Sequence, residues 1–166
     1  MIPHPDQDGA VVRCAIVTVS DTRTAQTDRS GQLICQMLET AGHAIGFYDL
    51  LPDEPDRIRD LLQTLSARSD LDVVLLNGGT GIAPRDTTYD AIEQLLDKVL
   101  PGFGELFRAL SFQEIGSRAI ASRAVAGVCA GKLVFSLPGS SNAVKLALEQ
   151  LILPELVHLV GQIQGR

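Results

Sequence analysis

Two patterns of apolar residues alternate along the chain. Short runs rich in Val, Ile and Leu are typical of buried strands, and they are separated by longer segments in which apolar residues recur every three or four positions, as in helices. The predicted strands are residues 11–19, 44–51, 72–76, 125–129 and 133–137. The last two runs lie on either side of Gly131 and predict a hairpin.

Helical segments lie between these strands. Residues 30–41 place their apolar side chains on one face, and Gly42 follows as a stop signal. The other predicted helices are residues 55–68, a segment capped by Thr87 or Thr88, residues 102–110, a segment running from Asn142 to a break at Pro154, and residues 155–163. The alternation predicts βαβ units and a largely parallel sheet with helices on both faces.

The composition fits one ordinary globular domain. The chain has 166 residues, of which 45% are hydrophobic and 20% charged. The first ten residues are polar and contain two prolines, which predicts a flexible arm over residues 1–10. Residues 11–166 are then expected to form a single domain.

The charge balance argues against a nucleic-acid partner. Lys and Arg number 14 against 20 Asp and Glu, so the net charge is −6, and no basic surplus exists to neutralise a phosphate backbone. Aromatic residues make up 4% of the chain and Trp is absent, so an aromatic stacking platform is not expected. A local pocket for a small phosphate remains compatible with this composition.

The sequence predicts a cytoplasmic protein without a membrane partner. The three cysteines are widely spaced and fit neither a disulfide framework nor a CxxC metal site. The first residues lack the basic and apolar regions of a secretory signal. The most apolar stretch, residues 119–139, is interrupted by Arg123 and Lys132 and is no membrane span.

Glycine-rich and polar loops follow four of the predicted strands. If these strands are parallel, their loops share one edge of the sheet, where ligands of α/β proteins bind. Gly78, Gly79 and Gly81 fall within four residues of one loop. Glycines allow positive φ, and successive N–H groups in such a turn form an anion-binding nest. A phosphate cradle and a simple tight turn fit these residues equally well.

The segment Pro138-Gly139-Ser140 admits two interpretations. Its N–H groups and the following helix N-terminus suit a phosphate. Capping of that helix by Ser141 or Asn142 explains the same residue types and is favoured when the segment is taken alone.

Three acids and two arginines fall in the same loops. Asp21, Asp53 and Asp86 suit a Mg-nucleotide, because Mg²⁺ takes one or two carboxylates together with substrate phosphates. Arg23 and Arg85 suit bidentate contacts to phosphate. Asx turns for the acids and pairing of Arg85 with Asp86 are the structural alternatives. The sequence shows no histidine pair with metal-binding spacing and no nucleophile elbow.

Several segments taken in order form a more specific set. They are Val19-Ser-Asp-Thr-Arg, Leu51-Pro-Asp-Glu, Leu76-Asn-Gly-Gly-Thr-Gly-Ile-Ala-Pro-Arg-Asp-Thr-Thr, Pro101-Gly-Phe-Gly-Glu-Leu-Phe-Arg, Ser122-Arg-Ala and Leu137-Pro-Gly-Ser. The set resembles the MoaB/MogA family of molybdenum cofactor biosynthesis proteins from about residue 13 to the C-terminus. Two further segments are more similar to the MoaB branch than to MogA: Ser111-Phe-Gln-Glu-Ile-Gly-Ser and Pro138-Gly-Ser-Ser-Asn-Ala-Val.

The resemblance implies a fold, a reaction and an assembly. The fold is a three-layer α/β/α sandwich with a mostly parallel central sheet. The reaction is the Mg-ATP-dependent adenylylation of molybdopterin, which gives adenylyl-molybdopterin and pyrophosphate and would make the protein a nucleotidyltransferase. The assembly is a homotrimer or a homohexamer.

The resemblance also implies roles for particular residues. Asp53 and Asp86 match two family aspartates essential for activity, and they are expected to be catalytic and to hold Mg²⁺. Residues expected to bind the nucleotide and the pterin are Ser20, Asp21, Gly78, Gly79, Thr80, Gly81, Arg85, Pro138, Gly139 and Ser140.

Two other functions stay open from the sequence. One is a molybdopterin-binding or carrier protein without catalysis, because the chain resembles the MoaB branch and some MoaB proteins lack both acids. This chain keeps both acids, which favours activity. The other is a hydrolase of damaged nucleotides, because related domains occur in such enzymes.

Overall fold

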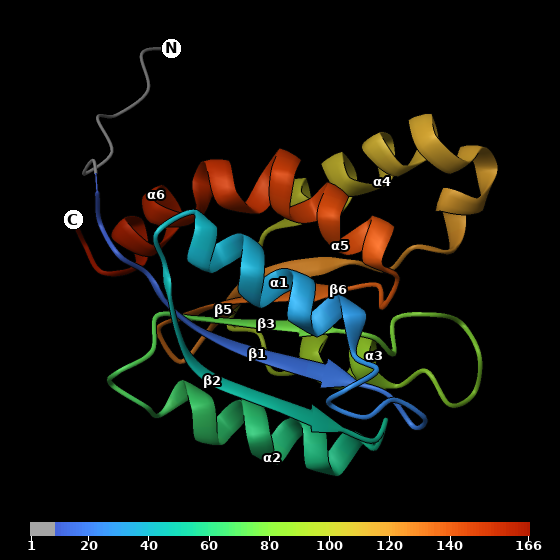
Figure 1. Cartoon of the computed structure of the whole chain (residues 1–166), viewed down its shortest axis with the longest axis horizontal. Coiled ribbons are helices and arrows are strands. Elements are labelled where there is room, and N and C mark those ends of the chain that lie inside the picture. The colour runs from blue at the N-terminus through green and yellow to red at the C-terminus, as the bar shows by residue number, and fades with distance from the viewer. Residues whose placement is uncertain (1–8) are drawn as a thin grey trace.

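One six-stranded sheet runs through the middle of the computed structural model, which describes residues 9–166 (Figure 1). Its strands are β1 (Arg13–Val19), β2 (Ala44–Leu51), β3 (Val73–Asn77), β4 (Lys98–Val99), β5 (Val125–Cys129) and β6 (Lys132–Leu137). Their order across the sheet is β2-β1-β3-β6-β5-β4. The pairs β1–β2, β1–β3 and β3–β6 are parallel, and β5 is antiparallel to both β6 and β4. The mostly parallel sheet is therefore confirmed.

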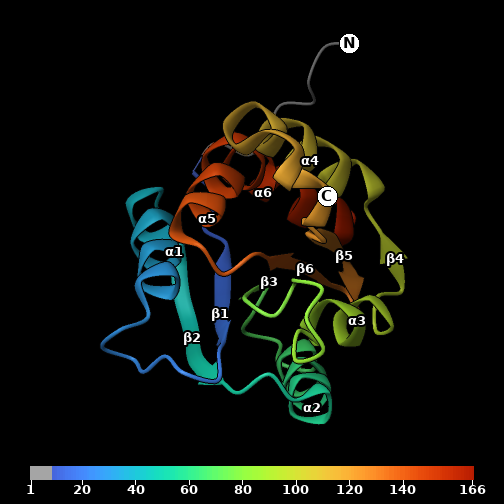
Figure 2. The same cartoon turned by 90° about the vertical axis from the view of Figure 1, so that its right-hand side faces the viewer.

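Helices cover both faces of the sheet (Figure 2). The helices are α1 (Arg29–Thr40), α2 (Pro55–Ser66), α3 (Thr88–Glu93), α4 (Pro101–Ile115), the 3₁₀ helix η1 (Gly116–Ala121), α5 (Ser141–Ala147), the π-helical turn η2 (Leu148–Ile152) and α6 (Leu153–Ile163). One apolar core lies between the sheet and α1, α4, α5 and α6, and the other lies between the sheet and α2 and α3. This is the expected three-layer α/β/α sandwich.

The central strands are buried on both faces. Every residue of β3 is buried, and so is every residue of β1 after Arg13. Cys14 and Ile16 point into one core and Ala15 and Val17 into the other, because successive side chains of a strand point to opposite faces. Burial on both sides explains why these strands read as continuous apolar runs in the sequence.

The predicted hairpin is confirmed. Ala130 and Gly131 connect β5 to β6, with φ of 47° and 77°. Positive φ at both central residues is the geometry of the two-residue turns that match the twist of paired strands.

Two expectations about helices need correction, and one short strand was missed. The helix predicted over residues 102–110 extends through α4 and continues as η1. The chain does not break at Pro154: α5, η2 and α6 follow without a gap, and the wider π-helical turn precedes the proline, which sits in the first turn of α6. The edge strand β4 was not predicted, because its two exposed residues carry no alternation.

The predicted arm over residues 1–10 lies outside the described residues except for Gly9 and Ala10. Within residues 9–166, no helix is long and apolar enough to cross a membrane.

Candidate functional site

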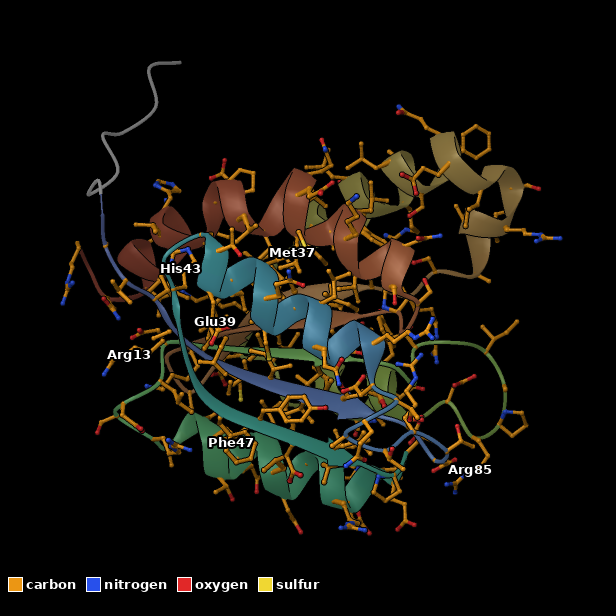
Figure 3. The ribbon with its side chains drawn as sticks, viewed as in Figure 1. Arg13, Met37, Glu39, His43, Phe47 and Arg85 are labelled. Carbon is orange, nitrogen blue, oxygen red and sulfur yellow. The ribbon has the colours of Figure 1, made fainter. Side chains whose placement is uncertain are left out.

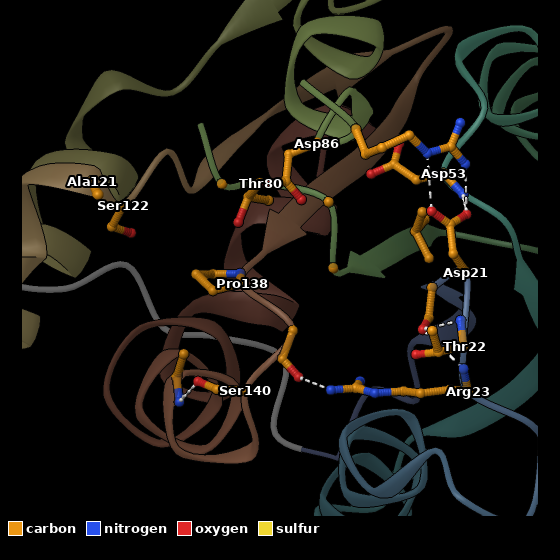
Figure 4. Close-up of a pocket in the computed structure, with 18 of the residues that line it drawn as sticks. Asp21, Thr22, Arg23, Asp53, Thr80, Asp86, Ala121, Ser122, Pro138 and Ser140 are labelled. Atoms are coloured by element: carbon orange, nitrogen blue, oxygen red, sulfur yellow. Dashed lines mark hydrogen bonds and ion pairs between the residues drawn. The ribbon is translucent and has the colours of Figure 1, made fainter. Parts of the chain in front are cut away.

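The loops after β1, β2, β3 and β6 meet at one edge of the sheet around a cavity of about 590 Å³ (Figure 4). Every residue predicted to bind ligand, to hold metal or to act in catalysis lines this cavity: Ser20, Asp21, Asp53, Gly78, Gly79, Thr80, Gly81, Arg85, Asp86, Pro138, Gly139 and Ser140. They converge because the four strands are parallel and end together. Their roles stay predictions, whereas their proximity is a property of the fold.

The loop after β3 requires glycine at two positions. Gly78 and Gly79 have φ of +100° and +67°, which other residues rarely adopt. A Cβ on Gly78 would overlap the carbonyl oxygen of Val19, and a Cβ on Gly79 would overlap the side chains of Thr88 and Asp53. The backbone of this loop therefore lies directly against the end of β1 and against the Asp53 carboxylate.

Asp53 is 5% exposed and lies opposite the start of α3. Its Oδ1 accepts hydrogen bonds from the Thr87 hydroxyl (2.6 Å), the Thr87 N–H (3.2 Å) and the Thr88 hydroxyl (3.3 Å). Thr87 occupies the N-cap position of α3 but does not cap that helix with its own side chain, because its hydroxyl is directed to Asp53. Sequence reasoning identified the threonines only as caps and missed this contact.

Asp21 and Arg85 form an ion pair across the mouth of the cavity. Arg85 donates through Nη2 (2.8 Å) and Nε (3.1 Å) to the two oxygens of Asp21, and Figure 3 shows Arg85 beyond the ends of β1 and β2. These hydrogen bonds from Arg85, followed by one from the Asp53 N–H, lower the pKa of Asp21 below its usual value. Arg85 therefore pairs with Asp21, not with the neighbouring Asp86.

The Asp86 carboxylate lies beside Gly81, the last residue of the glycine loop (residues 78–81). Its Oδ2 accepts a hydrogen bond from the Ala83 N–H at 3.2 Å, which is a local turn contact. A Cβ on Gly81 would lie 2.6 Å from the same oxygen. Asp53 and Asp86 thus border the same glycine loop, Asp53 at Gly79 and Asp86 at Gly81.

The loop after β6 begins α5 and is held by Arg23. Ser140 accepts a hydrogen bond from the Ala143 N–H at 3.2 Å, so the cap is Ser140 and not Ser141 or Asn142. Arg23 donates to the Gly139 carbonyl at 2.9 Å (Figure 4). It also donates to the Ser30 hydroxyl at 2.6 Å. The guanidinium of Arg23 is therefore engaged by the protein and joins two loops of the site.

A row of buried polar side chains beneath the cavity was missed from the sequence. The Asn77 amide donates to Thr18 (2.9 Å) and accepts from Ser30 (2.9 Å), and Asp28 accepts from the Gly31 N–H as the cap of α1. The available signal was a polar residue near the end of each central apolar run, Thr18 and Asn77. These contacts fix the ends of β1 and β3 below the glycine loop.

Helix α4 and η1 supply a further wall that sequence reasoning did not assign to the site. Their lining residues include Phe107, Ser111, Ile115 and Arg118, and Ser122, which directly follows η1, also lines the cavity. Figure 4 shows Ser122 on the side of the cavity away from Asp21. Ser122 belongs to the segment Ser122-Arg-Ala, which the sequence identified only as a family motif, so the place of Ser122 at the cavity is known only from the fold.

The acidic side chains of the cavity suit a divalent cation only if a bound ligand supplies further oxygen donors. Among residues 9–166, no group of three or more His, Cys, Asp or Glu side chains is arranged to hold a metal ion. Asp53 and Asp86 at the glycine loop match the usual Mg²⁺ donor set of one or two carboxylates completed by substrate phosphates and water. Asp21 is already paired with Arg85, so a three-acid site is not preformed.

Comparison with known proteins places this geometry in a family. Residues 15–158 match the model of a probable molybdopterin binding domain. Molybdenum cofactor biosynthesis protein B of Halalkalibacterium halodurans is 54% identical over 161 residues, which cover 96% of this chain and 95% of the relative.

Solved structures agree in fold along almost the whole chain. A crystal structure of a molybdenum cofactor biosynthesis protein B superposes with a TM-score of 0.93 at 50% identity and covers 96% of this chain and 100% of that one. The tungsten cofactor synthesizing protein MoaB from Pyrococcus furiosus superposes with a TM-score of 0.82 at 37% identity and covers 93% and 98%.

Proposed function

Because the chain belongs to the MoaB/MogA family of molybdenum cofactor biosynthesis proteins and is closest in motif to its MoaB branch, we propose that it adenylylates molybdopterin with Mg-ATP. The products are adenylyl-molybdopterin and pyrophosphate. The role in molybdenum cofactor biosynthesis follows from the family, and the particular reaction is the proposal.

One observation carries the proposal: two glycine-containing loops and the carboxylates of Asp53 and Asp86 border the same cavity. Backbone N–H groups and a bound cation are the usual means of stabilising phosphates that react with each other. The cavity of about 590 Å³ lies in the usual size range of small-molecule sites.

The reaction needs positioning more than acid–base chemistry. A phosphomonoester has a second pKa of about 6, so the terminal phosphate of molybdopterin is anionic at neutral pH. One of its oxygens attacks the α-phosphorus of ATP, the bond from that phosphorus to the β-bridging oxygen breaks, and pyrophosphate leaves with that oxygen. No proton has to be removed first. The absence of histidine from the cavity lining, within residues 9–166, is compatible with this scheme.

The protein would supply orientation and charge. The glycine loop and the Pro138–Ser140 loop would hold phosphate oxygens through their N–H groups, and Arg85 stands at the cavity mouth. Asp53 and Asp86 would hold Mg²⁺, which neutralises the charge that develops on pyrophosphate.

The proposed assembly is a homotrimer or homohexamer. Leu106, Phe112, Ile115 and Ile120, which are 54% to 85% exposed, give α4 and η1 an outward apolar surface. Ile115 also lines the cavity, so a second copy on this surface would border the site. Sedimentation of the purified protein tests this, and a monomer at all concentrations would contradict it.

The second candidate function is a molybdopterin carrier without turnover. One observation favours it: Oδ1 of Asp53 already accepts three hydrogen bonds from Thr87 and Thr88, so this acid has a structural task without a metal.

Pyrophosphate release with purified protein, molybdopterin, ATP and Mg²⁺ separates these functions. Release that requires both the pterin and the metal, with adenylylated pterin as product, is expected. No release despite tight pterin binding would establish the carrier instead. Nucleotide hydrolysis without pterin would establish a hydrolase.

A further inference from the structure

Arg123 holds the back of the glycine loop. The residue lies between η1 and β5 and does not line the cavity, whereas Thr80, Gly81 and Asp86 do. Its guanidinium donates to the carbonyl oxygens of Thr80 (3.1 Å), Gly81 (2.6 Å) and Asp86 (3.4 Å). One side chain from a distant part of the sequence therefore binds carbonyl oxygens near the start and near the end of the segment between β3 and α3.

The remaining face of the guanidinium is also engaged. Nη1 donates to both oxygens of Asp90 (3.1 and 3.3 Å), and the group lies over the Tyr89 ring at 4.7 Å from its centroid. Each of the three guanidinium nitrogens thus donates a hydrogen bond to α3 or to the loop before it. Arg123 is fixed in orientation and has no donor left for a ligand in the cavity.

The direction of these carbonyls determines the direction of the N–H groups. In a planar trans peptide the C=O and N–H point to opposite sides, so a carbonyl drawn toward Arg123 turns the following N–H away from it. The Thr87 N–H, which follows the Asp86 carbonyl, does reach Asp53. Among residues 9–166, no acceptor binds the N–H groups of Gly81 and Ile82, which follow the carbonyls of Thr80 and Gly81.

We propose that Arg123 is a positioning residue that orients the glycine loop for anion binding. By binding the carbonyl oxygens of Thr80 and Gly81 from behind, it leaves the N–H groups of Gly81 and Ile82 free for the oxygens of a phosphate or pyrophosphate group. The inference rests on the proposed phosphate-binding function of this loop. It assigns to Arg123 a role that needs the shape of its guanidinium in addition to its charge.

Calorimetric titration with pyrophosphate tests the proposal in Arg123→Lys and Arg123→Gln. The lysine variant keeps the charge but cannot span three carbonyls. We expect both variants to raise the Kd for pyrophosphate about tenfold, as when only about a tenth of the molecules hold a competent loop. Asp90→Asn is the matched control: it removes the ion pair, keeps the carbonyl contacts and should change the Kd by less than about twofold.

Three results would overturn the proposal. If Arg123→Lys binds pyrophosphate as tightly as the wild type while Arg123→Gln binds it weakly, the positive charge at position 123 is sufficient and the shape of the guanidinium is not needed. If both variants lose thermal stability but keep their Kd at 25 °C, the role is only structural. If pyrophosphate leaves the amide NMR signals of Gly81 and Ile82 unchanged in the wild type, the N–H groups do not bind it, and this measurement needs no variant.

The proposed function can be judged separately in the same experiments. A wild-type protein that forms adenylyl-molybdopterin, with Arg123→Lys equal to it in both turnover and Kd, would leave the reaction established and remove only the positioning role. A wild-type protein that binds neither pyrophosphate nor ATP and forms no product would overturn both.

Discussion

The Thr87 hydroxyl lies 2.6 Å from Oδ1 of Asp53, which joins the loop after β2 to the start of α3. Asp53 is 5% exposed, and a carboxylate so little hydrated needs hydrogen-bond donors to be stable. Thr87 and Thr88 provide them. Asp53, which is expected to hold a metal, therefore also connects the loop after β2 to the start of α3.

Thr87→Ala should destabilise the protein. The change removes the shortest hydrogen bond to Asp53 and should lower the free energy of unfolding by about 1–3 kcal/mol, because the acceptor is charged and buried. Thr87→Ser keeps the hydroxyl and should stay much closer to the wild type. Urea denaturation measures both. Equal stability of Thr87→Ala and the wild type would show that the contact contributes nothing.

Removal of either site carboxylate should abolish turnover without abolishing binding. If Asp53 and Asp86 hold Mg²⁺, Asp53→Ala and Asp86→Ala should lose pyrophosphate release while molybdopterin still binds. Asp60→Ala, an exposed acid on α2, is the control and should remain active. The readouts are pyrophosphate release and pterin fluorescence titration. Unchanged turnover in both site variants would eliminate the metal-ligand assignment.

Gly79→Ala should be far more harmful than alanine at another glycine. Position 79 has φ of +67°, which costs roughly 1–2 kcal/mol for other residues, and the new Cβ would also overlap Thr88 and Asp53. Gly161→Ala in α6 meets open space and should stabilise the helix by about 0.5–1 kcal/mol. Thermal unfolding compares the two variants. A stable, active Gly79→Ala protein would contradict the close approach of the loop to Asp53.

Much of the fold was predictable because its signals are local. Strands β1 and β3 are buried on both faces, so their sequences are almost entirely apolar and easily recognised as strands. The convergence of the loops then followed from parallel pairing alone. The resemblance to a known family supplied the identity of Asp53 and Asp86 as site residues, which their local sequence did not distinguish from turn acids.

The rest depends on contacts between distant residues. Arg85 pairs with Asp21, 64 residues earlier, although Asp86 is its neighbour. Arg123 contacts the Thr80 carbonyl from 43 residues away, and neither position shows an unusual pattern. The π-helical turn before Pro154 likewise has no local signature, because the apolar spacing of α5 and α6 reads as ordinary helix.

The last prediction concerns Asp72, at the opposite end of the sheet from the cavity. Asp72 accepts hydrogen bonds from the Arg13 N–H (2.9 Å) and from Nε (3.0 Å) and Nη2 (2.9 Å) of the same residue. Figure 3 shows Arg13 at that end, far from Arg85. Burial raises the pKa of Asp72, but the hydrogen bonds and charge of Arg13 outweigh it, so the pKa is below its usual value.

A lowered pKa in the folded state fixes the sign of the pH dependence. The contribution of Asp72 is fully present above the unfolded pKa of about 3.9 and is lost as the pH falls through the lower folded value. Asp72→Asn should therefore be less stable than the wild type at pH 7, and the difference should shrink as the pH falls from about 5 to about 2. Urea midpoints across this range measure it, with exposed Asp60→Asn as the control. A gap between wild type and Asp72→Asn that stays constant with pH would show that the Arg13 pair does not hold the carboxylate in its charged form.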